Sequence, residues 1–358
     1  MGIELIKPNT NIDFLGVRKI CATISGALIL IGLVSIILKG GLRYGIDFAG
    51  GINIQVKFNE DIDTTKVADA LKDSGLKGVR IQRFGQSSLH QYLIRAAVTE
   101  DQPEMVRNKV SLALKKLNKS FEIQRLEMVG PKIGSELKEK ALEAFFYAVL
   151  LISIYISGRF EQKWGTAAIM AIALSLGVYI LKLIHMPISI LIIAAIIITL
   201  VLCWYLKLNY ALGAVVALIH DVLITVGMFS LLDKEFDLTV VAGLLTIIGY
   251  SLNDTIVIFD RIRENLREQK KKGSLFDIIN RSINETLSRT ILTSGTTLLV
   301  VIAMLLLGGG VIHNFALSLF IGIIVGTYSS IYIASSILVG IGPTPEKQKE
   351  TETAQATV

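Results

Sequence analysis

Acidic side chains inside apolar stretches are the residues of this sequence best suited to chemistry. Asp221 follows His220 in the middle of one apolar run, and Asp254 follows Asn253 in the next. A charge in the hydrocarbon of a bilayer costs several kcal/mol, so an ionisable group there is a functional candidate by default. Burial disfavours a charged carboxylate whereas a nearby cation favours it, and the two effects together can let a carboxylate exchange protons near neutral pH. We therefore predict that Asp254 loads and releases protons.

Polar residues recur at helical spacing on either side of Asp254. Positions three or four apart share one side of a helix. One stripe comprises Tyr250, Ser251, Asp254 and Arg261, with Thr246, Gly249 and Asn253 beside it, and a second comprises Arg289, Thr293, Thr296 and Thr297. We predict a relay formed by Asp254, Arg289, Asn253 and Asp221, supported by the hydroxyl groups of Ser251, Thr293, Thr296 and Thr297.

A structural role is the alternative for the same residues. Asp254 could simply pair with Asn253 or a serine, and Arg289 stands at the edge of its apolar run, where arginines extend to the lipid headgroups. His220 and Asp221 do not form an obvious catalytic pair, because adjacent helical positions point about 100° apart. The residues alone favour the relay for Asp254 and headgroup contact for Arg289.

The elements that must hold these residues are membrane-spanning helices. The chain has 358 residues, of which 52% are hydrophobic and only 18% are charged, against roughly 25% charged in soluble proteins. A spanning helix takes about 20 residues. Apolar runs of suitable length occupy residues 20–38, 141–157, 165–184, 188–206, 210–232, 238–259, 290–307 and 314–339. The sequence predicts an α-helical polytopic membrane protein with about eight spans, the transmembrane bundle covering residues 141–340.

The basic excess follows membrane topology. The net charge of +6 comes largely from short loops, and lysine and arginine in such loops mark the cytoplasmic side. The densest cluster lies in a predicted cytoplasmic loop at residues 260–289. An even number of spans then places both termini, residues 1–19 and 341–358, in the cytoplasm. Because the basic residues form no recognised nucleic-acid motif, no nucleic-acid partner is expected, and two cysteines in apolar runs predict no metal site.

Residues 39–140 are predicted to fold outside the cytoplasm. Alternating apolar residues indicate strands near 52–58, 79–84, 92–98 and 121–129, and helical spacing covers 63–76 and 103–117. The order β-α-β-β-α-β is the ferredoxin-like α+β arrangement, which by itself names no function. Glycine-rich edges at residues 45–51 and 129–134 frame this domain, and we interpret them as turns that need a positive φ.

Another amphipathic segment covers residues 274–287. Leu275, Ile279, Ile283 and Leu287 share one face of this segment. A helix of this kind is predicted to lie in the membrane interface.

The segment Gly-Tyr-Ser-Leu-Asn-Asp-Thr-Ile-Val-Ile-Phe-Asp-Arg-Ile-Arg-Glu-Asn at residues 249–265 resembles the SecF signature of the SecD/SecF family of protein-export membrane subunits. Residues 45–51, 129–131, 211–221 and 286–294 agree with the same family in order. The resemblance covers the chain from about residue 10 to residue 340.

This resemblance implies a non-enzymatic subunit of the bacterial inner membrane, related to the resistance-nodulation-division superfamily. Its expected partners are SecD as a pseudo-twofold mate, the SecYEG channel, YajC, YidC and the translocating preprotein. The expected function is to use the proton-motive force, without a cofactor, to promote late outward movement of secreted polypeptide. In the family, the residues matching Asp254 and Arg289 belong to the proton path, so the resemblance gives Arg289 a role that its position alone does not.

One departure from the family concerns the number of spans. Family subunits have six, and the surplus here falls in residues 164–208, which we interpret as an inserted helical hairpin facing lipid. A small-molecule exporter of the same superfamily and a passive stabilising subunit are the alternative functions, and sodium is the alternative coupling ion. For the exterior domain we expect a gating or substrate-holding role, because it lies where the emerging chain would pass.

Overall fold

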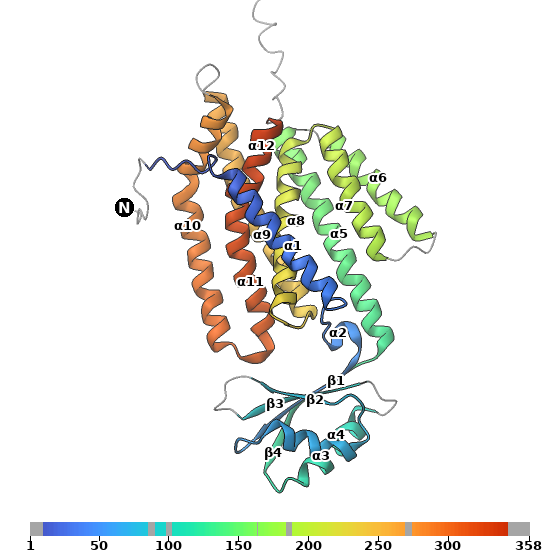
Figure 1. Ribbon diagram of the computed structural model, residues 1–358. Coiled ribbons are helices and arrows are strands. Elements are labelled where there is room, and N and C mark those ends of the chain that lie inside the picture. Colours follow the sequence, from blue (N-terminus) through green and yellow to red (C-terminus); the bar gives the residue numbers. More distant parts are fainter. Residues whose placement is uncertain are drawn as a thin grey trace, which may run out of the picture.

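The computed structural model describes residues 10–84, 90–97, 102–162, 164–183, 188–268 and 274–342. A helical bundle stands above a small α+β domain (Figure 1). The helices of the bundle are α1 (Arg18–Leu38), α5 (Pro131–Glu161), α6 (Trp164–Leu183), α7 (Ile188–Tyr205), α8 (Asn209–Leu231), α9 (Leu238–Glu268), α10 (Leu275–Leu307) and α11 (Gly309–Ser329). A π-helical turn, η3 (Ser330–Ala334), joins α11 to α12 (Ser335–Ile341).

The span count differs in part from the expected eight. Among the described residues, 6 helices are long and apolar enough to cross a membrane: α1, α5, α8, α9, α10 and the continuous α11–α12. The apolar parts of α6 and α7 are shorter. Both helices pack against α5, and α7 also packs against α8, on the side of the bundle away from α10 (Figure 1). That α6 and α7 also cross the membrane therefore stays a prediction.

The amphipathic segment at residues 274–287 is not a separate interfacial helix, so that expectation is wrong. It forms the first turns of α10, which begins at a capping box in which Ser274 Oγ accepts a hydrogen bond of 3.2 Å from the Asp277 amide. Ile279 and Ile283 are buried in the protein core with Leu15. Most of the predicted loop at 260–289 is therefore helix, formed by the last turns of α9 and the first turns of α10. The apolar face of these first turns of α10 packs against the protein, and the polar face is exposed to solvent.

The small domain contains β1 (Gly51–Phe58), α3 (Thr64–Leu71), β2 (Arg80–Phe84), β3 (Gln91–Ala96), α4 (Pro103–Lys115) and β4 (Phe121–Val129), with a 3₁₀ turn, η1 (Lys72–Ser74), after α3. Its antiparallel sheet has the order β2-β3-β1-β4. Ile54 and Val56 of β1 are buried with Val67 of α3 and Val110 of α4. Both helices cover the sheet face that points away from the bundle, so the other face looks toward the bundle (Figure 1).

The two glycine-rich edges meet where this domain joins the bundle. A short helix, α2 (Ile46–Ala49), is followed by Gly50 and Gly51, whose φ angles are 72° and 147°. A Cβ atom on Gly134 of α5 would lie 3.0 Å from the carbonyl oxygen of Phe48. Glycine is therefore required at this junction both for a positive φ and for a close backbone approach.

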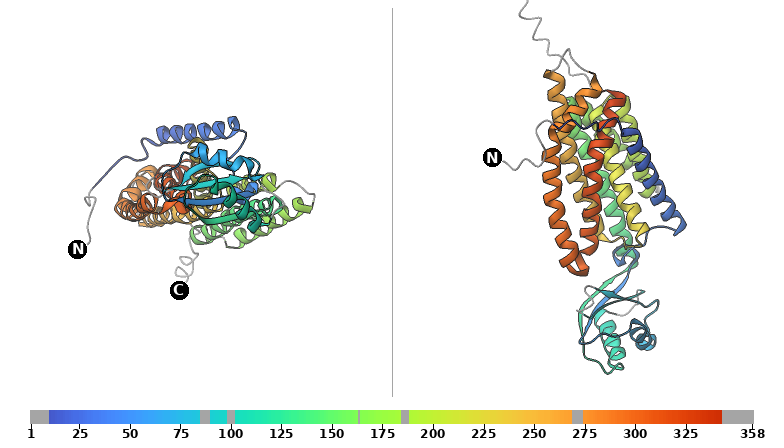
Figure 2. Two further views of the ribbon diagram at one scale, coloured as in Figure 1. Left: turned by 90° about the horizontal axis from the view of Figure 1, so that it is seen from below. Right: turned by 60° about the vertical axis from the view of Figure 1, so that its left-hand side comes forward.

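Helix α1 lies along the outside of the bundle, against α8 (Figure 2). Its buried residues are small: Ser25, Gly32 and Ser35. The Ser35 and Ser230 hydroxyl oxygens are 2.9 Å apart, and a Cβ atom on Gly32 would lie 2.8 Å from Gly227 Cα. Small residues thus permit a near contact of the two backbones, as is common between membrane helices.

We predict that Gly32→Ala destabilises the protein. The added methyl group must separate α1 from α8, and overpacking of this kind costs about 1–3 kcal/mol. Thermal unfolding of the detergent-solubilised protein should show a lower midpoint for Gly32→Ala. Gly26→Ala is the matched control on the same helix, because a Cβ there meets no atom within 4 Å. Equal midpoints for the two variants would contradict the close packing.

The buried hydroxyl group of Tyr92 forms hydrogen bonds with Asp61 and Ile62, in the segment that follows β1. It accepts a hydrogen bond of 2.8 Å from the Ile62 amide and donates one of 2.7 Å to Asp61 Oδ1. The hydrogen bond from Tyr92 lowers the pKa of Asp61 below its usual value. Ionised Asp61 therefore favours the folded domain at neutral pH, and this contribution is lost as the pH falls through the lowered pKa.

We predict that Tyr92→Phe weakens the small domain by about 1–3 kcal/mol, since the Ile62 amide loses its buried partner. Backbone amide hydrogen exchange of β1 and β3 in the full-length protein should be faster in the variant. The stability that the unaltered domain loses at acidic pH, as Asp61 becomes protonated, should be smaller in the variant. Tyr44→Phe is the control, because the Tyr44 ring is exposed. Unchanged exchange in Tyr92→Phe would contradict the assignment.

Candidate functional site

Two carboxylates lie inside the bundle at neighbouring helices. Asp221 of α8 is 1% exposed and Asp254 of α9 is 2% exposed. Both helices are long and apolar enough to span a membrane. Each carboxylate must therefore obtain its hydrogen bonds from the protein.

Asp254 has a short chain of hydroxyl partners. Ser294 Oγ of α10 donates a hydrogen bond of 3.1 Å to Asp254 Oδ2, and Thr327 Oγ1 of α11 lies 2.8 Å from Ser294 Oγ. Both partners are neutral. This chain connects α9, α10 and α11 through one carboxylate.

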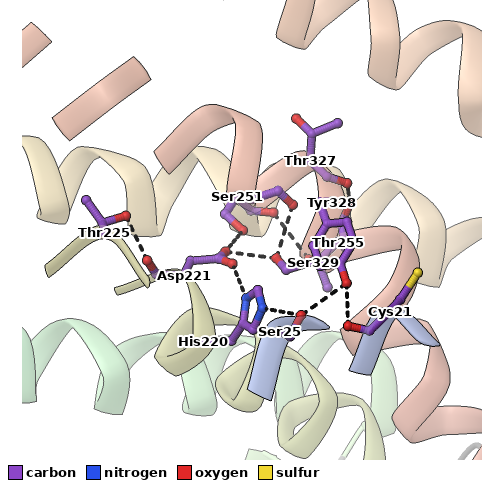
Figure 3. Close-up of polar contacts among 12 residues, drawn as sticks. Cys21, Ser25, His220, Asp221, Thr225, Ser251, Thr255, Thr327, Tyr328 and Ser329 are labelled. Atoms are coloured by element: carbon purple, nitrogen blue, oxygen red, sulfur yellow. Dashed lines mark hydrogen bonds and ion pairs between the residues drawn. The ribbon is translucent and has the colours of Figure 1, made fainter. Parts of the chain in front are cut away.

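Asp221 is held by more partners (Figure 3). Ser251 Oγ of α9 and Ser329 Oγ of α11 donate to Asp221 Oδ2 at 2.6 Å and 2.9 Å. His220 Nδ1 lies 2.9 Å from Asp221 Oδ1. Although adjacent helical positions point apart, the imidazole ring is long enough to reach the neighbouring carboxylate. This contact was not predicted from the sequence.

The Asp221 network continues to α1. His220 Nε2 lies 2.9 Å from Ser25 Oγ, and Ser25 Oγ donates a hydrogen bond of 3.1 Å to the Tyr328 hydroxyl oxygen. That hydroxyl donates to the carbonyl oxygen of Cys21 at 2.7 Å. Figure 3 shows this continuous path from α8 to α1, then to α11 and back to α1.

Three consecutive residues of α11 join the two networks. Thr327 reaches the Asp254 chain on α10, Tyr328 contacts α1, and Ser329 bonds to Asp221 on α8. The π-helical turn η3 begins at the next residue, and Ser335 Oγ donates to the Ser330 carbonyl oxygen at 3.0 Å. Such turns often occur at functional sites because they permit a local change of helical register.

The other predicted site residues occupy different positions. Asn253 and Arg289 are exposed, on the outer sides of α9 and α10. Arg289 is near enough to act electrostatically on Asp254, and among the described residues no ion pair joins the two. Thr293, Thr296 and Thr297 donate to carbonyl groups of their own helix. Ser251, placed beside Asp254 by the spacing, bonds instead to Asp221.

Several site residues could not be found from the sequence. Ser294 is one position away from the stripe that begins at Arg289, and Thr327 and Ser329 lie in a long apolar run where hydroxyl residues are common. Their partners are set by helix packing, which one sequence does not specify. Within the described parts of the chain, no group of three His, Cys, Asp or Glu side chains could hold a metal ion.

An exposed polar surface runs down α9 and α10. We call it the outer polar face. Its exposed polar residues are Thr246, Asn253, Arg289 and Thr296, with Gly249 beside them, and the apolar Leu292 and Leu299 are exposed on the same side of α10. The two helices pack against each other, so the face is shared between them. Polar side chains facing hydrocarbon are unusual in membrane helices, where they mostly face protein or water.

Comparison with known proteins identifies the family. The model for the C-terminal region of the protein export membrane proteins SecD and SecF matches residues 109–201 and 177–343, and the SecD/SecF GG motif matches residues 35–62. The protein translocase subunit SecF of Calditerrivibrio nitroreducens is 43% identical over 340 residues, covering 94% of this chain and 96% of that protein. The SecF of Vibrio alginolyticus is 38% identical over 341 residues, covering 95% and 92%.

Solved structures agree in fold. The crystal structure of SecDF, a translocon-associated membrane protein from Thermus thermophilus, has a TM-score of 0.68 and 29% identity over 94% of this chain. This chain spans 39% of that longer one. Another SecDF structure, in a super-membrane-facing form, has a TM-score of 0.55. The GG-motif match includes the glycines that join the small domain to the bundle. On these grounds, the chain belongs to the SecF family of protein translocase subunits.

Proposed function

We propose that this chain couples the proton-motive force to export of preproteins as part of the Sec accessory complex. The naming of its relatives as translocase subunits supports the export role. The observation that carries the coupling is Asp254, which is buried in an apolar bundle with the hydroxyl of Ser294 as its hydrogen-bond donor. A neutral hydroxyl compensates a buried negative charge incompletely, so the carboxylate gains by binding a proton.

The proposed mechanism links this proton to helix movement. A change of charge on Asp254 alters its hydrogen bond with Ser294, which is itself bonded to Thr327 of α11. Because Ser329 of α11 holds Asp221, the second carboxylate and His220 respond to the same shift. One proton crossing 100 mV supplies about 2.3 kcal/mol, which is enough to bias two conformers that differ by a few kcal/mol.

Arg289 and Asn253 serve the same proton path in this proposal. Both lie on the outer polar face rather than in the bundle interior. From there, the arginine supplies a counter-charge for Asp254 when the proton has left. Sodium is the alternative ion, since carboxylate and hydroxyl oxygens also suit a hard cation.

SecD is the proposed partner at the outer polar face. Contact with a second subunit would remove these polar side chains from lipid. The solved SecDF chains contain much more protein than this chain matches, which supports a mate of similar kind. The SecYEG channel, YajC, YidC and the preprotein remain proposed partners from the family resemblance, as do the inner-membrane location and two cytoplasmic termini.

The hairpin α6–α7 is proposed to face lipid. Ile169, Ile172 and Ile193 are exposed apolar residues on it. The family model matches in two overlapping segments that both include residues 177–201, which supports an insertion at this position. We also propose that the small domain is ferredoxin-like and extracytoplasmic. The passive-scaffold function is separated from this proposal by the first experiment below.

We predict that Asp254→Asn abolishes the gradient-dependent part of export while the protein still assembles with SecD. Asparagine keeps the size of the side chain and can still hydrogen-bond Ser294, but it cannot exchange a proton. Preprotein export should be measured in vesicles under separate proton and sodium gradients. Asp260→Asn, on the exposed end of the same helix, should retain export. An unaltered rate in Asp254→Asn would favour the passive scaffold.

We predict that Thr296→Trp reduces copurification of SecD at least tenfold, because the indole would occupy the outer polar face. Ile172→Trp is the matched control. Ile172 is 66% exposed on the α6–α7 hairpin, which is proposed to face lipid, so a tryptophan there should leave the recovery of SecD unchanged. Both variants should be compared by quantitative pull-down at equal expression. Equal recovery of SecD would rule out this face as the contact.

A further inference from the structure

A large cleft separates the small domain from the bundle. Its volume is about 930 Å³, at the upper end of the range of about 300–1,000 Å³ for ligand sites. One wall is the open sheet face, and the other is formed by the exterior ends of α9, α10 and α11. We call it the exterior cleft. It is far from Asp254 along α9 and plays no part in the proton path.

Carboxamide side chains form the floor of the exterior cleft. Strand register places Gln55 opposite Leu93, and Leu93 opposite Gln82. Asn53 and Gln91 lie on the same sheet face and also line the cleft. The side-chain amides of Gln55 and Gln91 each donate one hydrogen bond to Gln124 Oε1, at 2.8 Å and 2.9 Å. Because each carboxamide has two N–H donors and an acceptor oxygen, both glutamines keep a donor and an acceptor for a ligand. A peptide group carries the same pair, so this floor matches the hydrogen-bonding groups of a main chain.

Most charged residues of the cleft are engaged with other groups of the protein. Glu235 is in ion pairs with Arg43 and Arg95, and Arg125 pairs with Glu127. Asp47 accepts a hydrogen bond of 3.0 Å from the Leu238 amide, and Asp237 accepts one of 3.0 Å from the Val240 amide. Acidic and basic groups are therefore balanced, which fits a neutral hydrogen-bonding ligand better than an anion or a metal cation.

Two further features indicate what the ligand is. Asn53 Oδ1 is buried without a hydrogen-bond partner in the described structure, although buried acceptors are normally paired. Leu306 and Leu307, at the rim, are 70% and 78% exposed. The unpaired oxygen of Asn53 can accept a hydrogen bond from an N–H group of a ligand, and the exposed leucines can contact apolar side chains. A suitable ligand therefore has both free amide groups and apolar side chains. Unfolded polypeptide has both, because its backbone groups are not paired in secondary structure.

We propose that the exterior cleft binds an extended segment of unfolded polypeptide through its main-chain amides. The carboxamide floor hydrogen-bonds peptide groups irrespective of sequence, and the leucine rim contacts side chains. The proposal rests on the export role above and names the surface that would hold the exported chain. A folded domain does not fit a cleft of this volume, whereas a few extended residues do.

Photo-crosslinking tests the location in the full-length protein assembled with SecD. A photoreactive residue replaces Gln55 in the cleft or, as the matched control, Leu112, which is 66% exposed on α4. With a preprotein stalled in vesicles, we expect adducts from position 55 at least tenfold above those from position 112. Adducts to lipid alone, or equal yields at the two positions, would overturn the proposal. If gradient-driven export persists in the same vesicles, the export role stands although the cleft assignment fails.

Peptide binding tests the chemistry without any change to the protein. A fluorescent, unstructured peptide and its backbone N-methylated counterpart share side chains but differ in N–H donors. We expect the N-methylated peptide to bind at least tenfold more weakly to the full-length protein. Asn53→Leu, which keeps the side-chain size, should remove most of that difference. Equal affinity of the two peptides for the unaltered protein would exclude main-chain recognition.

Discussion

A buried carboxylate in an apolar bundle must be satisfied by neighbouring side chains, and much of this structure follows from that requirement. Asp221 draws Ser251 from α9, Ser329 from α11 and His220 from its own helix into one network. Through Ser25 the same network reaches α1. Four helices are thereby held in register by one side chain, because removing any partner would leave a buried polar atom unpaired.

The two carboxylates differ in how completely their hydrogen bonds are satisfied, and this difference underlies the separate roles that we propose for them. Asp221 has three side-chain partners, whereas Asp254 has the hydroxyl of Ser294. In the proposed function, the better satisfied group holds the helices together and the less satisfied one exchanges a proton. The shared contact is α11, where Thr327 and Ser329 serve different carboxylates just before a π-helical turn.

The bundle is also bound to the small domain at the start of α9. The amide of Gly45 donates to the Phe236 carbonyl oxygen at 2.9 Å, and the Phe236 amide donates to the Arg43 carbonyl oxygen at 2.8 Å. Because α9 carries Asp254 and these bonds lie just before its first turn, movement of that helix would reach the glycine-rich junction. The glycines there adopt positive φ angles and permit the close backbone approach at Gly134, so the junction depends on their freedom of conformation.

The sequence predicted those features that depend on local pattern. Apolar runs and strand alternation indicated the helices and the order β-α-β-β-α-β, and the cost of a buried charge singled out Asp221 and Asp254. It did not predict Ser294, Ser329 or the contact between His220 and Asp221, because these depend on the rotation of packed helices. Periodicity likewise predicts that one face of residues 274–287 is buried, but it does not specify whether that face packs against lipid or against protein.

Infrared difference spectroscopy of the reconstituted protein with SecD would test most directly whether Asp254 exchanges a proton. On a change from low to high pH, we predict loss of a protonated-carboxyl band that is absent from Asp254→Asn and retained in Asp221→Asn. Identical difference spectra for the unaltered protein and Asp254→Asn would contradict it.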